Sequence, residues 1–283
     1  MPKAPPSVQV RPGPHSRRLE DAEHALRLGR PDEAERLAAE VLKSERVNVL
    51  AGRLLGTALL MQDRPAEAVE PLQRAARRSG DPAIETLLAR ALAGARRPDA
   101  ALAQLRQATT RRPPLPQAFL ELGDQLAALA RFEDAAAAYE AGLALTPEAQ
   151  VLRVGLAYLR LRLGDRARAR ALFEAARAAA PERRDAQVGL AAALVQDGEW
   201  AQAAELYRAA LEARPDDAAS RIELARCLLE MGQREAGEAA LRIAAGADPR
   251  LAGQAALALA ATPRGRLFLR PSAAARFLGV RSA

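Results

Sequence analysis

Small and apolar residues recur along this chain at the spacing of a helical hairpin. A small residue marks seven positions, with five intervals of 34 residues and one of 33: Ala34, Ala68, Ala101, Ala135, Ala169, Ala203 and Gly237. A second residue follows four positions after each marker, one turn further along the same helix face: Ala38, Leu72, Leu105, Tyr139, Phe173, Tyr207 and Leu241. The pattern predicts seven copies of one pair of helices, and each copy buries its apolar face only by stacking on its neighbours.

Two further patterns locate the helices within each copy. A leucine followed by a small residue recurs in six copies, and the small member allows a second helix to approach closely: Leu55-Gly56, Leu88-Ala89, Leu122-Gly123, Leu156-Ala157, Leu190-Ala191 and Leu224-Ala225. Proline closes five copies, because it lacks an N–H and clashes with a continuing helix: Pro113, Pro147, Pro181, Pro215 and Pro249. We expect hairpins near 15–48, 49–81, 82–115, 116–149, 150–183, 184–217 and 218–251, each made of a helix A followed by a helix B.

Turn and breaker residues refine this picture. Gly29, Gly164, Gly198 and Gly232 mark turns between helix A and helix B, where a positive φ costs glycine least. Pro71 lies inside a predicted helix B and favours a bend there. The proline-rich junction at 109–116 fits either an ordered turn between copies or a Pro-x-x-Pro ligand for an SH3-type domain, and we favour the turn.

The recurring positions resemble the tetratricopeptide repeat family over residues 15 to 251. The fourth copy carries the family's set most completely, in Leu122-Gly123, Ala135, Tyr139 and Pro147. The resemblance implies an all-α, right-handed superhelical solenoid of about seven tetratricopeptide hairpins with a C-terminal capping helix. We divide the chain into a disordered segment at 1–14, the solenoid at 15–251, and a capping helix with a basic tail at 252–283.

The resemblance also implies where a partner would bind, because helix A lines the concave face in this family. Carried onto this chain, the family's groove positions include the following partner-binding residues: Arg53, Thr57, Arg90, Asp124, Val154, Tyr158, Leu161, Val188, Ala192 and Arg226. The middle of this predicted groove is apolar and suits an amphipathic helix or an extended apolar peptide. The carboxylate clamp of some family members is missing, since the single Asn48 lies in a turn and the two lysines lie outside helix A.

The sequence therefore predicts a non-enzymatic scaffold that binds a peptide or helix of a partner protein in this groove. Two alternatives stay open. The protein would otherwise be a regulatory or targeting subunit for an enzyme such as a glycosyl- or sulfotransferase, or a repeat protein that assembles with itself. Neither the partner nor the oligomeric state follows from the sequence.

Charge and composition argue against a nucleic-acid-binding function and indicate the kind of organism from which the chain comes. The formal net charge is +7, but residues 1–30 contribute +3 and residues 250–283 contribute +6, which leaves the repeats at −2. Of the 42 basic residues, 40 are arginine, which with the abundant alanine indicates a bacterial, GC-rich source. Nucleic-acid binding is not expected, because it needs a basic stripe with stacking aromatics and only 3% of the residues are aromatic.

Catalytic and metal chemistry find no support in the sequence. His15 and His24 are the only histidines, Cys227 is the only cysteine, and a phosphate-binding glycine loop is absent. We expect no cofactor, no metal and no catalytic residue. Without a signal segment or an apolar run of membrane-spanning length, we expect a cytoplasmic protein.

The C-terminal tail departs from the repeat pattern. Residues 262–278 hold two of the five phenylalanines together with several arginines. Three interpretations compete: a cap over the last apolar face, a docking segment for a partner, and a basic amphipathic contact with a membrane surface. We favour the cap.

Overall fold

The computed structural model describes residues 15–262, 266 and 271–279, and these residues form sixteen α-helices and one short 3-10 helix, with no strand among them. By its internal contacts the chain divides into two compact units, Met1–Pro147 and Glu148–Ala283, which we call unit 1 and unit 2. The segment 1–14, for which we expected disorder, lies outside the described residues.

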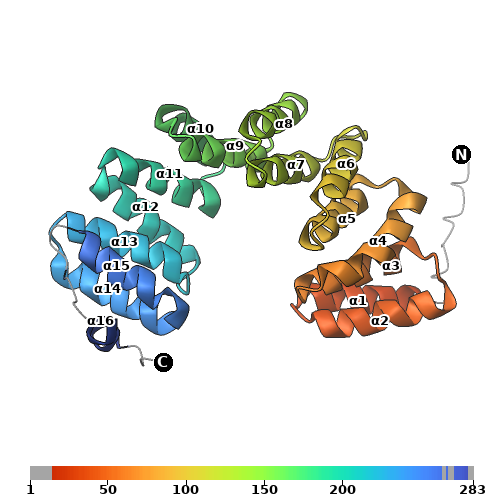
Figure 1. Cartoon of the computed structure of the whole chain (residues 1–283), viewed down its shortest axis with the longest axis horizontal. Coiled ribbons are helices and arrows are strands. Elements are labelled where there is room, and N and C mark those ends of the chain that lie inside the picture. The colour runs from red at the N-terminus through yellow and green to blue at the C-terminus, as the bar shows by residue number, and fades with distance from the viewer. Residues whose placement is uncertain (1–14, 263–265, 267–270, 280–283) are drawn as a thin grey trace, which may run out of the picture. The chain divides into compact units, whose positions relative to one another are not determined.

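Each predicted copy is a pair of consecutive helices (Figure 1). Unit 1 contains α1 (Ser16–Arg27), α2 (Pro31–Ser44), α3 (Val49–Met61), α4 (Pro65–Ser79), α5 (Pro82–Gly94), α6 (Pro98–Thr109), α7 (Pro116–Ala128) and α8 (Phe132–Leu145). Unit 2 contains α9 (Gln150–Arg162), α10 (Arg166–Ala179), α11 (Arg184–Asp197), α12 (Trp200–Ala213), α13 (Ala218–Glu230), α14 (Arg234–Ala247), η1 (Pro249–Leu251), α15 (Ala252–Ala261) and α16 (Pro271–Leu278). The odd-numbered helices α1 to α13 are the predicted helices A.

Small residues let the two helices of a hairpin pack closely. A Cβ atom placed on Gly123 of α7 would overlap the ring of Tyr139 in α8, and one on Gly56 of α3 would overlap Leu72 in α4. Tyr139 is almost fully buried, and its hydroxyl donates a hydrogen bond of 2.5 Å to Asp124. The predicted close approach beside each leucine is therefore present where the small residue is glycine.

The turns between helix A and helix B share one backbone geometry. Gly29, Gly164, Gly198 and Gly232 all have positive φ, as the sequence predicted. Three further turns place a non-glycine residue in the same region, with φ of 56° at Asp63, 59° at Arg96 and 58° at Ala130. These three were not predicted, because only glycine marks a positive φ without ambiguity.

Proline has the expected position at the start of several helices B. Pro31, Pro65 and Pro98 begin α2, α4 and α6, where the missing N–H has no helical partner to lose. Pro71 lies inside α4, and the helix continues through it to Ser79. The junction at 109–116 is an ordered connection, and Pro116 is the first residue of α7.

The described part of the tail packs on the last hairpin. α15 contacts α13 and α14, and α16 contacts α14 and α15. Ala255, Leu259 and Leu278 are buried in one cluster with Leu229 and Leu241. α16 therefore covers an apolar face of unit 2. Within the described residues, no helix is both long and apolar enough to cross a membrane.

Candidate functional site

A cavity of about 520 Å³ lies on the helix-A side of unit 2. We call it the helix-A cavity. It is lined by Val188, Ala192, Val195 and Gln196 of α11, Tyr207 of α12, Ala219, Ser220, Glu223 and Arg226 of α13, and Gln254 of α15. Small and aliphatic side chains supply much of its wall, and amide and charged groups supply the rest. This combination is typical of sites that bind a ligand by apolar contact and fix its orientation with a few polar groups.

The charged groups of the cavity lie on one helix. Glu223 and Arg226 of α13 approach to 3.5 Å, and both side chains are about 40% exposed. The guanidinium of Arg226 also lies 6.0 Å from the ring centre of Trp200. Because the ion pair is open to water, its net stabilisation is small, and a carboxylate of a bound partner would compete with Glu223 for Arg226 at little cost.

Tyr207 is the aromatic residue of the cavity wall, and it is almost fully buried. Burial, together with the negative charge of Glu223, raises the pKa of Tyr207 well above its ordinary value. Burial likewise raises the pKa of the neighbouring Cys227 thiol to about 12. Both groups are therefore neutral at physiological pH, and Cys227 is a packed apolar residue of the core rather than a nucleophile.

Three of the ten predicted partner-binding residues line the helix-A cavity: Val188, Ala192 and Arg226. Three others belong to α9 of the same unit and do not line it. Val154 is buried in the core cluster, and Leu161 packs against that cluster. Tyr158 is 40% exposed, with its hydroxyl donating to the backbone oxygen of Asp185 at 3.1 Å and its ring edge-on to Phe173 at 4.9 Å. Tyr158 therefore ties α9 to α10 and α11 while keeping one side open.

The remaining four predicted residues lie in unit 1, on three helices A. Arg53 of α3 pairs with Glu23 at 3.4 Å, and the hydroxyl of Thr57 donates to the backbone oxygen of Arg53. Arg90 of α5 pairs with Glu121 of α7 at 3.7 Å.

Asp124 of α7 accepts the Tyr139 hydroxyl. Partial burial of the Asp124 carboxylate raises its pKa, and that hydrogen bond opposes the rise. The polar atoms of all four residues thus already have partners within unit 1.

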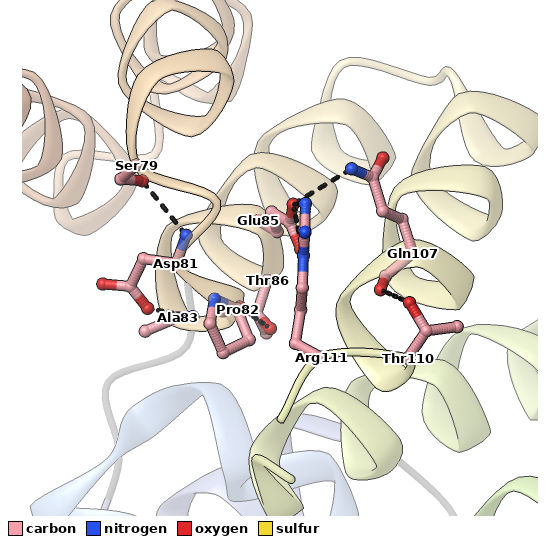
Figure 2. A network of polar contacts seen from close by, with 9 residues as sticks. All are labelled: Ser79, Asp81, Pro82, Ala83, Glu85, Thr86, Gln107, Thr110 and Arg111. Carbon is pink, nitrogen blue, oxygen red and sulfur yellow. Dashed lines mark hydrogen bonds and ion pairs between the residues drawn. The ribbon is translucent and has the colours of Figure 1, made fainter. Parts of the chain in front are cut away.

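Sequence reasoning did not identify the most buried carboxylate of the described chain. Glu85 of α5 is only 1% exposed. Figure 2 shows its carboxylate facing Arg111 and Gln107. Arg111, in the junction after α6, donates to it through Nε and Nη2, the latter at 2.6 Å, and Gln107 donates at 3.1 Å. Its hydrogen bonds to Glu85, together with the negative charge of that carboxylate, raise the pKa of Arg111. This network joins a helix A to the next junction, so we assign it to the stability of unit 1.

In the part of the chain that the structure describes, no three His, Cys, Asp or Glu side chains lie close enough together to hold a metal ion. The polar groups of the helix-A cavity are an exposed ion pair, a neutral tyrosine, a serine and two amides. Such a set can hold a peptide by hydrogen bonds and charge.

Two tetratricopeptide repeat models match the chain, the first over residues 19–82, 86–150 and 154–218 and the second over 194–260. The chain belongs to the tetratricopeptide repeat family. The expected all-α class with seven consecutive helical hairpins is confirmed. A comparison with curated proteins found no match.

Solved tetratricopeptide structures share the fold at low sequence identity. PilF of Pseudomonas aeruginosa is 19% identical, with a TM-score of 0.60 over 71% of this chain and 92% of that one. A thermophilic tetratricopeptide protein of Thermus thermophilus is 25% identical, with a TM-score of 0.55 over 64% and 99%. YrrB, described as having an unusual peptide-binding site, is 19% identical, with a TM-score of 0.50 over 69% and 98%. Membership of this family supports a general role as a protein–protein interaction scaffold.

Proposed function

We propose that the protein is a non-enzymatic scaffold of the bacterial cytoplasm that binds a peptide segment of a partner protein on the helix-A side of unit 2. The helix-A cavity carries this proposal. It is large enough for two or three side chains, and its wall combines aliphatic groups with a single exposed cation. The peptide-binding site described for YrrB supports the proposal at the level of the fold.

Each part of the cavity has a separate task in the proposed complex. Val188, Ala192 and Val195 provide the apolar wall against which a partner side chain is buried. Arg226 pairs with an acidic group of the peptide, and the amides of Gln196 and Gln254 bond its backbone. Tyr158 and Leu161 on α9 would extend the contact toward the start of unit 2, as the sequence predicted. The predicted groove residues of unit 1 are not needed for this site.

Affinity capture with a plugged variant tests the proposal. Ala192→Phe places a large side chain in the helix-A cavity, and Ala171→Phe makes the same change at an exposed position of α10, away from the cavity. Each full-length protein is used to retain partners from its native cell lysate, and the retained proteins are identified by mass spectrometry. We expect one set of proteins to be retained by wild type and Ala171→Phe and lost with Ala192→Phe.

The retained set also separates the alternatives. A transferase lost with Ala192→Phe would identify the protein as a targeting subunit that uses the same site. Retention of additional copies of the protein alone would favour self-assembly. If all three proteins retain the same partners, the helix-A cavity is not the binding site and the proposal is wrong.

A further inference from the structure

A second cavity, on the helix-B side of unit 1, has the chemistry of a docking site of its own. It has a volume of about 310 Å³ and lies between α2, the loop that follows it, α3 and α4. We call it the helix-B groove. Its lining is mostly apolar, from Ala39, Leu42, Val47, Leu55, Pro71 and Ala75. None of these residues belongs to the groove that the sequence predicted.

The helix-B groove exists because two helices approach closely at its base. Gly52 of α3 faces the backbone of α4, where a Cβ atom would lie 3.0 Å from the oxygen of Pro71 and 3.2 Å from Cβ of Ala75. The absence of side-chain bulk at Gly52 and Ala75 leaves the space above them open. At the rim, Val47 is 52% exposed, and Leu42 and Leu55 are only partly buried. Exposed apolar surface of this kind costs free energy in water unless something covers it.

The charges around the helix-B groove are unbalanced. Lys43 and Arg46 line it, are exposed, and form no ion pair with any residue that the structure describes. Arg74 pairs with Glu70, so these two lining charges offset each other. The nearby Glu45 carboxylate accepts the side-chain amide of Asn48 at 2.8 Å and lies 3.6 Å from His15. The rim therefore carries two cations that have no ion-pair partner among the described residues, beside an apolar floor.

We propose that the helix-B groove docks an acidic linear segment of another protein, with one bulky aliphatic or aromatic side chain in the groove and Asp or Glu beside it. The volume fits one large side chain. The two unpaired cations attract the Asp or Glu side chains of the segment. This attraction favours an acidic partner and raises its association rate. The chain's own first fourteen residues hold Lys3 and Arg11 and no acid, so their charge argues against them as the occupant.

This surface is independent of the helix-A cavity, because it belongs to unit 1 and shares no lining residue with that cavity. A protein with both sites would hold two segments at once, either from two partners or from one. Linking two such contacts strengthens binding without any new interaction.

A peptide library tests the proposal on the full-length protein. A displayed library of random ten-residue peptides is selected on wild type and then on Ala39→Phe, which fills the helix-B groove without changing charge. We expect the peptides that bind wild type but not Ala39→Phe to share one large apolar residue flanked by Asp or Glu. If no peptide separates the two proteins, or if the separated peptides lack an acidic bias, the proposal is wrong.

Charge reversal gives a second, quantitative test with the peptide that the selection yields. Lys43→Glu with Arg46→Glu should weaken its binding at least about tenfold, since attraction becomes repulsion at the rim. The matched control is Arg27→Glu with Arg106→Glu, which makes the same change in net charge at exposed positions outside the groove. Equal weakening by both double variants would contradict a local contact.

An anionic membrane is the other possible occupant of such a surface. Binding to phosphatidylglycerol vesicles that depends on Lys43 and Arg46 but not on Ala39 would therefore overturn the peptide assignment.

Discussion

Single residues decide the local geometry at the turns of this repeat protein. Seven residues of positive φ lie between helix A and helix B, and four of them are glycine. At the other three positions an L side chain occupies the left-handed region. Aspartate tolerates this region, so Asp63 costs little, whereas at Arg96 and Ala130 the conformation costs roughly 1–2 kcal/mol. Ala130 is the clearest example, because its methyl group is exposed and gains no packing in return.

We predict that Ala130→Gly raises the free energy of unfolding by about 0.5–1 kcal/mol, because relief of the left-handed strain exceeds the added freedom of the unfolded chain. The reverse change, Gly29→Ala, lies in the same unit, and nothing lies within 4 Å of the new methyl group. It should lower the free energy of unfolding by a similar amount. Urea unfolding followed by circular dichroism measures both. A loss of stability in Ala130→Gly would show that this turn is not strained.

Between elements, the buried carboxylate Glu85 joins α5 to the junction that follows α6. The carboxylate is removed from water, while Arg111 remains 38% exposed. The two partners are therefore not equivalent. Removing Arg111 leaves the buried charge of Glu85 with one amide partner, whereas replacing both residues by apolar ones leaves an apolar contact.

We predict that Arg111→Ala lowers the free energy of unfolding, because it leaves the buried Glu85 carboxylate with only the Gln107 amide as a partner. The double variant Glu85→Leu with Arg111→Leu should lose less than this single change, because it leaves no buried charge unpaired. Chemical unfolding of the two proteins and wild type gives the comparison. The opposite order would mean that the ion pair itself, rather than the cost of an unpaired Glu85, dominates.

A second buried carboxylate ties the tail to the last hairpin. Glu238 of α14 lies 2.7 Å from Arg266 and 3.0 Å from Arg234, and the guanidinium of Arg266 lies 4.9 Å from the ring centre of Phe277 in α16. Burial alone would raise the pKa of Glu238. Hydrogen bonds from Arg266 and Arg234 outweigh burial and hold this pKa below its ordinary value of 4.5.

Because the pKa of Glu238 is lower in the folded than in the unfolded protein, its ionised carboxylate stabilises the fold at any pH above the ordinary pKa. This stabilisation is lost as the pH falls through the pKa of the folded state. We predict that Glu238→Gln is less stable than wild type at pH 7 and that the difference narrows as the pH falls from about 5 to about 3. Glu235→Gln is the control, since Glu235 is exposed on the same helix and forms no ion pair among the described residues. Unfolding curves at a series of pH values measure the difference. A gap of constant size would contradict the assigned role of Glu238.

For the molecule as a whole, the repeat sequence was enough to predict the seven hairpins and the helix A of each. The spacing of Ala and Gly markers carries that information directly, because stacking requires a small residue at the same place in every copy. The apolar residues of the tail also indicated packing, and Leu278 is buried. The Glu85 network did not follow, because its arginine lies 26 residues away in an irregular junction.

The candidate sites were less accessible from the sequence. Assigning groove positions by family pattern found Val188, Ala192 and Arg226, which line one cavity. The same pattern also selected Val154, which is buried in the core. It could not find the helix-B groove, because that surface depends on Gly52, a position at which the next two copies carry Glu85 and Phe119.

Site-specific photo-crosslinking tests whether the helix-A cavity of unit 2 holds a partner peptide. A photoreactive amino acid replaces Val188 in one protein and Ala171, on the exposed side of α10, in another. Both are expressed in the native cell and irradiated, and the adducts are sequenced by mass spectrometry. We predict an adduct at position 188 that maps to one segment of one partner, and none at position 171. An adduct only at position 171, or no adduct at either position, would show that the helix-A cavity does not hold a partner peptide.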